Sequence, residues 1–224
     1  MRLQGQLLDR VNGRIHRHTD HAPWCLSRTK RLIDVLLAGS LLILGAPVLA
    51  LVAAAIVIDN PGPVFFRQWR TGFAGQRFRI LKFRTMLMNA EQLKETLRPL
   101  NHHGPESPDF KIRNDPRMTR VGRILRRLSV DELPNLINVV QGDMSLVGPR
   151  PTSFDIDCYE DWHLERLAVL PGVTGLWQIS GRSDIGFDER VKLDCQYIYG
   201  QSFWLDAKIL LLTPFRVLGG RGAC

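Results

Sequence analysis

Hydrophobic positions in this chain are concentrated in one long run close to its N-terminus. Residues 35–58 are uncharged and predominantly apolar, and they are bounded by Asp34 and Asp59. About 20 apolar residues are enough for a helix to cross the hydrocarbon core of a bilayer. A run of this length is too long for a typical buried core helix. It therefore predicts a membrane segment, either a single transmembrane helix or a re-entrant helix.

Two features bear on the topology of this segment. Pro47 follows Gly45 and Ala46 at the middle of the run, where a proline removes a backbone hydrogen bond and bends a helix. Basic residues flank the run on both sides, and basic flanks prefer the cytoplasmic side of a membrane. A helix–break–helix that dips into the membrane and returns keeps both flanks on that side. Because kinked single spans also contain proline, the residues alone leave the two topologies evenly matched.

The charge pattern divides the chain into three parts. Residues 1–31 are basic and polar with weak periodicity, which is typical of a segment that is disordered or lies on a membrane surface. Residues 32–59 are the membrane segment, and a proline- and glycine-rich turn follows them. Residues 60–224 are predicted to form a cytoplasmic domain with interfacial helices. The basic residues of the two flanks are Arg2, Arg10, Arg14, Arg17, Arg28, Lys30, Arg31, Arg67, Arg70, Arg77, Arg79, Lys82 and Arg84.

The remaining pattern predicts a mostly helical α/β domain. Extended segments are expected at residues 64–68 and 77–83, on either side of a glycine-containing turn. The very apolar segment 202–218, which Pro214 interrupts, is expected to lie in the membrane interface or to pack on the core. Loops rich in proline or glycine are expected at residues 99–116 and 171–182. Helices are expected at residues 89–97, 117–127, 154–170 and 188–199.

The segment 129–151 combines a helix start with a stiff turn. Ser129 and Glu132 have the S-x-x-E spacing of a capping box, which places Asp131 in the first helical turn. Gly142 is predicted to end this helix, and the Gly-Pro-Arg-Pro turn after it presents Arg150 from a restrained backbone. The residues expected on the buried face of the helix are Leu133, Leu136, Ile137 and Val140.

The acidic pair Asp131-Glu132 is by itself ordinary helix capping, but its neighbours change that interpretation. A helix N-terminus with several guanidinium groups is typical of a phosphate site. Carboxylates in such a site repel the ligand unless they hold a metal ion or attack the phosphorus atom. The nearby arginines are Arg123, Arg126, Arg127 and Arg150.

Composition narrows the class of partner. The net charge of +8 over 224 residues indicates an anionic partner, such as nucleic acid, anionic lipid or a phosphorylated substrate. The apolar run and the lack of a recognisable binding motif disfavour nucleic acid. Four cysteines lie far apart without C-x-x-C spacing, which disfavours a structural zinc site and a disulfide framework. The pair His102-His103 is expected to be solvated rather than metal-bound.

Five motifs, in order, resemble those of the bacterial sugar transferases, the monotopic polyprenyl-phosphate phosphoglycosyl transferases of the small, exopolysaccharide-initiating type. Each motif is common alone, but five in this order are specific, and they cover the chain from about residue 30 to the C-terminus. They are Lys-Arg-Leu-Ile-Asp at 30–34, Lys-Phe-Arg-Thr-Met at 82–86, Leu-Ser-Val-Asp-Glu-Leu-Pro at 128–134, Gly-Asp-Met-Ser-Leu-Val-Gly-Pro-Arg-Pro at 142–151 and Pro-Gly-Val-Thr-Gly-Leu-Trp-Gln-Ile-Ser-Gly-Arg at 171–182.

The resemblance implies transfer of a sugar 1-phosphate from a UDP-sugar to undecaprenyl phosphate, which yields an undecaprenyl-diphosphate sugar and UMP. This reaction would be the first membrane step of exopolysaccharide, capsule or O-antigen assembly. The resemblance also implies a ping-pong reaction through a covalent phosphosugar on Asp131, with Mg²⁺ held by Glu132 and Asp131. The other functional residues of the family map onto Lys82, Arg126, Arg150 and, from its place near the C-terminal helix, Asp194.

The resemblance further implies a location at the bacterial inner (cytoplasmic) membrane, among its lipids, with the catalytic domain on the cytoplasmic face. It favours the re-entrant topology with the helix break at Pro47, although Ala46 stands where many members have serine. A non-catalytic basic adaptor of a polysaccharide assembly complex at the membrane surface would show the same charge and apolar patterns. No residue identifies the sugar, and the sequence is compatible with a homo-oligomer as well as a monomer.

Overall fold

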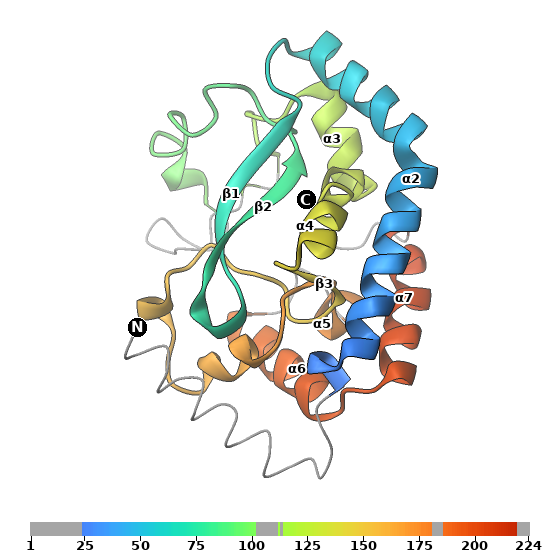
Figure 1. Cartoon of the computed structure of the whole chain (residues 1–224). Helices are drawn as coiled ribbons and strands as arrows, with labels where there is room; N and C mark the ends of the chain where they lie inside the picture. The colour runs from blue at the N-terminus through green and yellow to red at the C-terminus, as the bar shows by residue number, and fades with distance from the viewer. Residues whose placement is uncertain (1–23, 102–111, 113, 181–185, 219–224) are drawn as a thin grey trace.

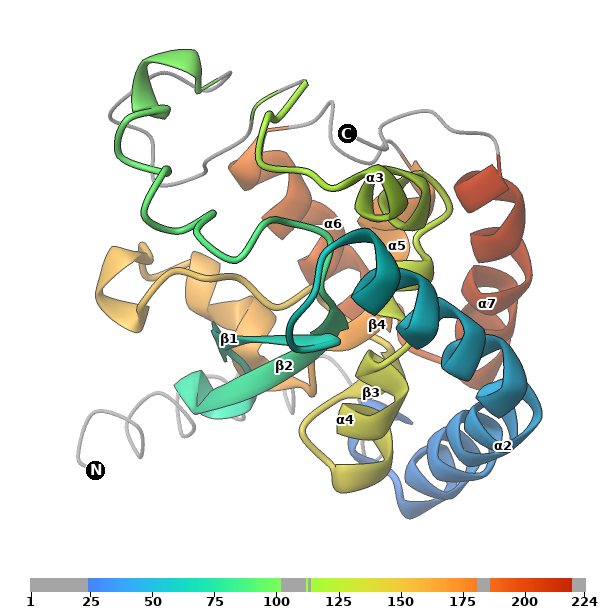
Figure 2. The same ribbon diagram turned by 90° about the horizontal axis from the view of Figure 1, so that it is seen from above.

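The structure, a computed structural model, describes residues 24–101, 112, 114–180 and 186–218 (Figure 1). These residues form a mostly helical fold, as the sequence predicts, together with two small sheets. The long helix α2 (Arg28–Asp59) runs along one side of the domain and packs against α4 (Asn135–Gln141) and, near its end, α3 (Arg120–Arg127). The C-terminal helix α7 (Phe203–Leu218) lies beside α2 (Figures 1 and 2).

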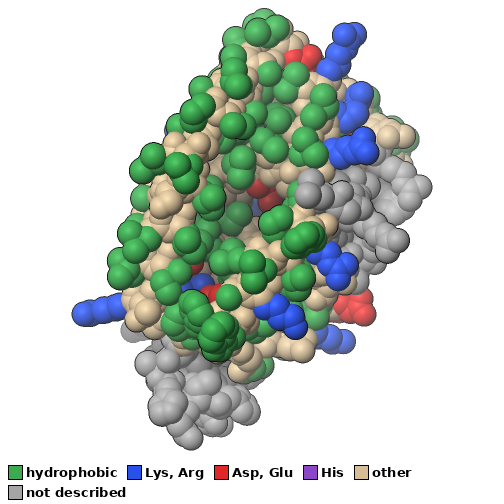
Figure 3. All heavy atoms as spheres, turned by 90° about the vertical axis from the view of Figure 1, so that its right-hand side faces the viewer, with side chains coloured by type: hydrophobic (Ala, Val, Ile, Leu, Met, Phe, Trp, Pro, Cys, Tyr) green, Lys and Arg blue, Asp and Glu red, His purple; other side chains and the backbone are tan. Residues whose placement is uncertain are grey.

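The apolar run forms one helix that is exposed rather than buried. Within the described residues, α2 is the helix that is long and apolar enough to cross a membrane, and 6% of its most apolar 18-residue window is buried. Pro47 lies inside this helix, so the expected break is a bend in one continuous element, and the curvature is visible in Figure 2. Figure 3 shows apolar side chains gathered over this side of the molecule. The exposure excludes a role as a core helix.

Both ends of α2 are attached to the same domain. Near its start, the buried Lys30 places its Nζ atom 2.6 Å from Asp206 of α7. At its end, Asp59 accepts a hydrogen bond of 2.9 Å from the backbone N–H of Val121 at the start of α3. The guanidinium of Arg84 donates to the carbonyls of Asn60 and Pro61, which directly follow the helix. The apolar helix α2 is therefore fixed to the domain at two points.

The contact between Lys30 at the start of α2 and Asp206 of α7 belongs to a buried polar network. Asp206 also accepts hydrogen bonds of 2.8 Å from Trp24 and from Tyr197, while Ser145 donates to Asp34 of α2 at 2.7 Å. The charge pattern of the sequence assigns residues 24–31 to the basic N-terminal segment, whereas in the structure they belong to the folded part of the chain. Residues 1–23 lie outside the described residues.

The sequence predicts one of the two sheets but not the other. Strands β1 (Phe65–Thr71) and β2 (Arg77–Phe83) pair antiparallel, which confirms the two extended segments. Strands β3 (Ser145–Val147) and β4 (Gly172–Thr174) pair parallel, and α5 (Leu176–Ser180) follows, where a loop was expected. A Cβ atom at Gly172 would lie 2.2 Å from the backbone nitrogen of Gly148. These glycines therefore let two backbones approach each other.

The predicted helices are confirmed in part. The expected helices at 117–127 and 188–199 are α3 and α6 (Phe187–Tyr199). Segment 89–97 instead forms a series of consecutive turns, without a regular helix, before the 3₁₀ helix η3 (Arg98–Leu100). Segment 154–170 contains only the short 3₁₀ helices η5 (Ile156–Cys158) and η6 (His163–Ala168).

Contacts with the β1–β2 hairpin explain the missing helix at 154–170. Thr71 donates a hydrogen bond to the carbonyl of Phe154, and Arg77 lies 2.6 Å from Asp155. These distant partners hold the start of the segment in an extended form. Helix α7 packs on the core through Ile209, which is fully buried, whereas Trp204 and Phe215 are exposed; a position in the membrane interface stays a prediction.

The buried pair of Lys30 and Asp206 predicts a large effect on stability. In Asp206→Asn, the Lys30 ammonium keeps its burial but loses its nearer carboxylate at 2.6 Å and retains only Asp34 at 3.6 Å, and we expect a loss of about 3 kcal/mol in the free energy of unfolding. Thermal unfolding in detergent would measure this loss as a lower Tm. The matched control is Asp155→Asn, which removes an ion pair whose carboxylate is exposed and should cost less than about 1 kcal/mol. Equal effects of the two substitutions would contradict the role of the buried pair.

Candidate active site

Asp131 and Glu132 lie in the 3₁₀ turn η4 (Val130–Glu132), between α3 and α4. The predicted capping box is wrong: Ser129 has a left-handed backbone with φ of 53°, and its side chain makes no cap hydrogen bond. The predicted helix stop at Gly142 is confirmed, with φ of 102°. Of the expected apolar face, Leu136 is buried and Ile137 is half-buried, whereas Leu133 and Val140 are exposed. Buried positions of α4 instead include two amides, Asn135 and Asn138.

Glu132 is held by two cations from distant parts of the chain. The Nζ atom of Lys82, on β2, lies 2.7 Å from Oε1 of Glu132. Arg150, in the turn after β3, donates to both carboxylate oxygens, with one of the two hydrogen bonds at 2.8 Å. The bidentate geometry is the strong form of an arginine–carboxylate contact. These charge-assisted contacts replace the local backbone contact that the capping box would have made.

The charges in this cluster shift the pKa values of its members. Burial alone would raise the pKa of Glu132, but the positive charges of Arg150 and Lys82 outweigh burial and hold this pKa well below its usual value. Burial lowers the pKa of Lys82, although Glu132 opposes this effect. Glu132 is therefore the carboxylate that stays ionised.

Asp131 differs from its neighbour in both contacts and pKa. Its side chain is buried, with 8% of the residue exposed, and no described side chain hydrogen-bonds to it. Burial raises its pKa, the negative charge of Glu132 raises it further, and Lys82 and Arg126 act in the opposite direction. A carboxylate with a raised pKa and no fixed partner is available to act as a base or a nucleophile.

The tetrapeptide 82–85 connects the cluster to the end of the apolar helix α2 and to α3. Lys82 pairs with Glu132, Arg84 binds the carbonyls after α2, and the hydroxyl of Thr85 accepts a hydrogen bond of 3.0 Å from Nε of Arg126. A Cβ atom at Gly122 would lie 2.0 Å from the carbonyl oxygen of Thr85, so α3 packs directly on this backbone. Arg126 is thereby positioned beside Asp131, whereas Arg123 and Arg127 are exposed and lie outside the cluster.

Asp194 lies behind the site rather than among the residues around Asp131. It is 1% exposed on α6 and pairs with Arg166 at 2.7 Å. Arg166 in turn donates a hydrogen bond of 2.7 Å to the backbone carbonyl of Arg150. Burial raises the pKa of Asp194 to about 6, and the charge of Arg166 opposes this rise. The predicted substrate-binding aspartate therefore supports the backbone of Arg150.

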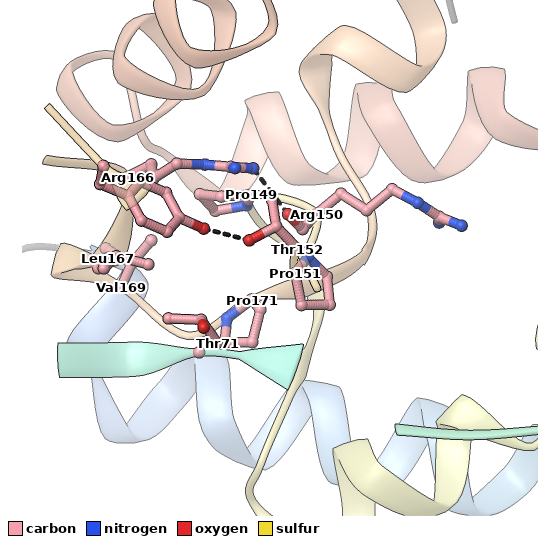
Figure 4. A pocket seen from close by; sticks show the side chains of 11 residues that line it. Thr71, Pro149, Arg150, Pro151, Thr152, Arg166, Leu167, Val169 and Pro171 are labelled. Carbon is pink, nitrogen blue, oxygen red and sulfur yellow. Dashed lines mark hydrogen bonds between the residues drawn. The ribbon is translucent and has the colours of Figure 1, made fainter. Parts of the chain in front are cut away.

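A small cavity lies beside this support. It is a shallow, partly open hollow, and its lining includes Arg166, Thr152 and Pro171. Figure 4 shows that the side chain of Arg150 extends away from this cavity, while Thr152 and Tyr159 are joined by a hydrogen bond at its wall. The cavity and the carboxylate cluster thus lie on different sides of the Gly-Pro-Arg-Pro turn.

The donor set bears on which kind of metal ion could bind. Within the described ranges, no group of three or more histidine, cysteine, aspartate or glutamate side chains could hold a metal ion. Asp131 and Glu132 are two adjacent carboxylates, and Mg²⁺ commonly takes one or two carboxylates with phosphate oxygens completing its shell. The residues therefore fit a Mg²⁺ ion that binds together with a diphosphate. They do not fit a cage made of protein ligands alone.

The structure brings together five of the predicted site residues: Asp131, Glu132, Lys82, Arg126 and Arg150. Sequence reasoning missed the supporting residues Thr85, Asn138 and Arg166. Thr85 lies within the motif at 82–86, whereas no residue pattern around Arg166 indicates its role. Pro47 lies in α2, apart from the cluster.

The fold combines an exposed apolar helix with a carboxylate cluster surrounded by cations, as expected of a membrane-associated protein that handles anionic substrates. A family model described as bacterial sugar transferase matches residues 25–220, and the chain belongs to this family. It is 46% identical to the galactosyl transferase CpsE of Streptococcus agalactiae over 199 residues, which cover 87% of this chain and 43% of that protein.

Two further relatives differ in length. The exopolysaccharide production protein ExoY of Rhizobium meliloti is 41% identical, with 87% of each chain covered. The undecaprenyl-phosphate galactose phosphotransferase of Salmonella typhimurium is 42% identical, and the match covers 87% of this chain and 41% of that protein. The chain therefore spans less than half the length of CpsE and the Salmonella protein, and most of the length of ExoY.

Proposed function

We propose that this protein transfers a sugar 1-phosphate from a UDP-sugar to undecaprenyl phosphate, forming an undecaprenyl-diphosphate sugar and UMP. The reaction would begin the assembly of an exopolysaccharide, capsule or O-antigen type glycan at the inner membrane. The name of the Salmonella relative supports a lipid-phosphate acceptor. The observation that carries the proposal is the contrast between Glu132, which two cations hold, and Asp131, which no described side chain holds.

The proposed reaction has two steps on one phosphorus atom. A carboxylate oxygen of Asp131 attacks the phosphorus that bears the sugar, and the bond to the UMP oxygen breaks with its electron pair leaving on UMP. An oxygen of undecaprenyl phosphate then attacks the same phosphorus and displaces the Asp131 carboxylate. Because the soluble product leaves before the lipid reacts, this order predicts ping-pong kinetics.

The first step brings a carboxylate toward a diphosphate, so the site must neutralise negative charge. Lys82, Arg126 and Arg150 supply three positive charges near Asp131 and Glu132. In the structure Lys82 and Arg150 pair with Glu132, and the phosphate oxygens of a donor would share or replace this partner. A Mg²⁺ ion held by Asp131 and Glu132 would supply further charge neutralisation.

The contacts of α2 support a re-entrant topology. A 32-residue helix that crossed the membrane would leave its two ends on opposite sides. Here Lys30 at one end binds α7, and Asp59 at the other end binds α3 of the same domain. A helix that enters and returns on the cytoplasmic face accommodates both contacts and places Asp131 near the lipid phosphates.

Release of UMP by the purified protein in detergent tests the reaction. With Mg²⁺ and a panel of UDP-sugars, but no lipid acceptor, we expect about one UMP per enzyme from the correct donor, together with a phosphosugar adduct detected by intact mass. Asp131→Asn should lower this release by about 10³-fold or more and abolish the adduct. Turnover that needs undecaprenyl phosphate and shows no adduct would overturn the covalent mechanism. Full cellular function of Asp131→Asn would instead support the adaptor.

The pKa of Asp131 predicts the pH dependence of UMP release. The ionised carboxylate is the nucleophile, so the rate falls as the pH drops through this pKa, which burial and Glu132 raise. Glu132→Gln removes a neighbouring negative charge and lowers the pKa of Asp131. Its acid limb should therefore lie at lower pH than that of the native protein, although the maximum rate also falls. Single-turnover rates over a pH series measure the limb, with the exposed Glu95→Gln as the control. An unmoved limb in Glu132→Gln contradicts this account.

Labelling in intact cells tests the topology. Cys25 is buried and makes a poor probe, so single cysteines are introduced at the exposed positions Thr29 and Pro63 in a variant without native cysteines. A membrane-impermeant maleimide should label neither Thr29→Cys nor Pro63→Cys until the inner membrane is permeabilised, and then should label both. Labelling of only one end from outside would show that α2 crosses the membrane.

A further inference from the structure

Asn138 is a buried amide of α4 with 2% of the residue exposed, and it connects this helix to the strand that carries Lys82. We infer that Asn138 is a positioning residue for Lys82: it holds β2 against the helix that follows Asp131 and Glu132. The inference rests on the proposed function, because Lys82 acts in that reaction through its charge.

The side chain of Asn138 bonds to the backbone of β2 in two directions. Its Nδ2 atom donates a hydrogen bond of 2.9 Å to the carbonyl of Arg79, and its Oδ1 atom accepts one of 3.0 Å from the N–H of Leu81. The strand pairs with β1 through its other edge. One amide therefore takes the place of a neighbouring strand at the edge facing α4. It fixes the backbone of the residue directly before Lys82.

Asn138 is itself rigidly held. Its Nδ2 atom lies 3.2 Å from Oδ2 of Asp143, and its backbone carbonyl accepts hydrogen bonds from Gly142 and Asp143 at 3.0 Å each. The amide plane therefore has little freedom to follow a shift of β2. A side chain that bonds in this way to two elements sets their relative position.

The position of β2 matters because Lys82 has a long, flexible stem with a charge at its tip. Its Nζ atom reaches Glu132, and its charge acts on Asp131. If β2 drifted from α4, the ammonium would lose its place relative to both carboxylates. A displacement of about 1 Å in such a site can lower a rate by about 10²-fold.

Asn135 provides a matched control on the same helix. It is also an asparagine and is 1% exposed, but its Oδ1 atom has no hydrogen-bond partner and it makes no bond to β2 among the described residues. Asn135→Ala therefore removes a buried amide from α4 without releasing the strand. A comparison of the two alanine variants separates the contact with β2 from the general cost of deleting a buried amide.

A double-mutant cycle on single-turnover UMP release tests the inference. We expect Asn138→Ala to lower the rate constant by about 10- to 100-fold, and Asn135→Ala to lower it by less than about threefold. In a Lys82→Ala background, where slow release is followed to long times by intact mass, Asn138→Ala should add less than about threefold. A purely structural role predicts the same loss in both backgrounds, and that result would overturn the inference.

A second variant and a second measurement cover two cases, a failure of Asn138→Ala to fold and an absence of UMP release by the native protein. If Asn138→Ala fails to fold, Asn138→Ser takes its place, because it leaves a small hydroxyl in the site and lacks the amide that bonds to both Arg79 and Leu81. If the native protein releases no UMP from any donor, the proposed function fails, and hydrogen exchange then tests the anchoring alone. Exchange in the peptide spanning residues 78–83 should become faster in Asn138→Ala and not in Asn135→Ala. Unchanged exchange in both variants would overturn the anchoring.

Discussion

The arrangement of the site depends on the contact of one carboxylate, Glu132, with two cations. Lys82 arrives on β2 and Arg150 on the turn after β3, so the three charges join segments that are distant in the sequence. A partly desolvated carboxylate is costly unless it is paired, and removal of Glu132 would leave two cations facing each other. Because Glu132 satisfies both cations, Asp131 keeps its carboxylate without a fixed partner. Asp131 and Glu132 thus differ in their contacts because both cations, Lys82 and Arg150, point toward Glu132.

The apolar helix α2 adds a second constraint on the same site. Its N-terminal end is bound through Lys30 to α7, and its C-terminal end is bound through Asp59 to α3. In the sequence, Lys30 and Arg84 belong to the basic flanks of the apolar run, but in the structure both are buried and bind protein groups. Arg84 and Lys82 are two residues apart, so the strand that contacts the end of α2 also supplies a cation to Glu132. A displacement of α2 would therefore also displace Lys82 relative to Asp131 and Glu132.

The sequence predicted well what depends on local periodicity or on motifs, and predicted poorly what depends on distant partners. Helices α3 and α6 and the β1–β2 hairpin follow from periodicity and turn residues, and the motifs identified the charged residues around Asp131. The capping box failed because Lys82 and Arg150, which are far from Ser129 in the chain, bind the glutamate that it requires. The β3–β4 pair was missed because each strand has only three residues, too few for a period to be visible.

The supporting residues share one physical principle that a single sequence conceals. Arg166 binds the backbone carbonyl of Arg150, and Asn138 binds the backbone on either side of Ile80 in β2. In both cases a buried polar side chain holds the main chain and not the charged group itself. In the proposed reaction, the side chains of Lys82 and Arg150 would exchange Glu132 for phosphate oxygens while their attachment points remain fixed. Tighter binding of the charged side-chain tips would oppose such an exchange of one anion for another. Binding of the backbone that carries these side chains does not oppose it.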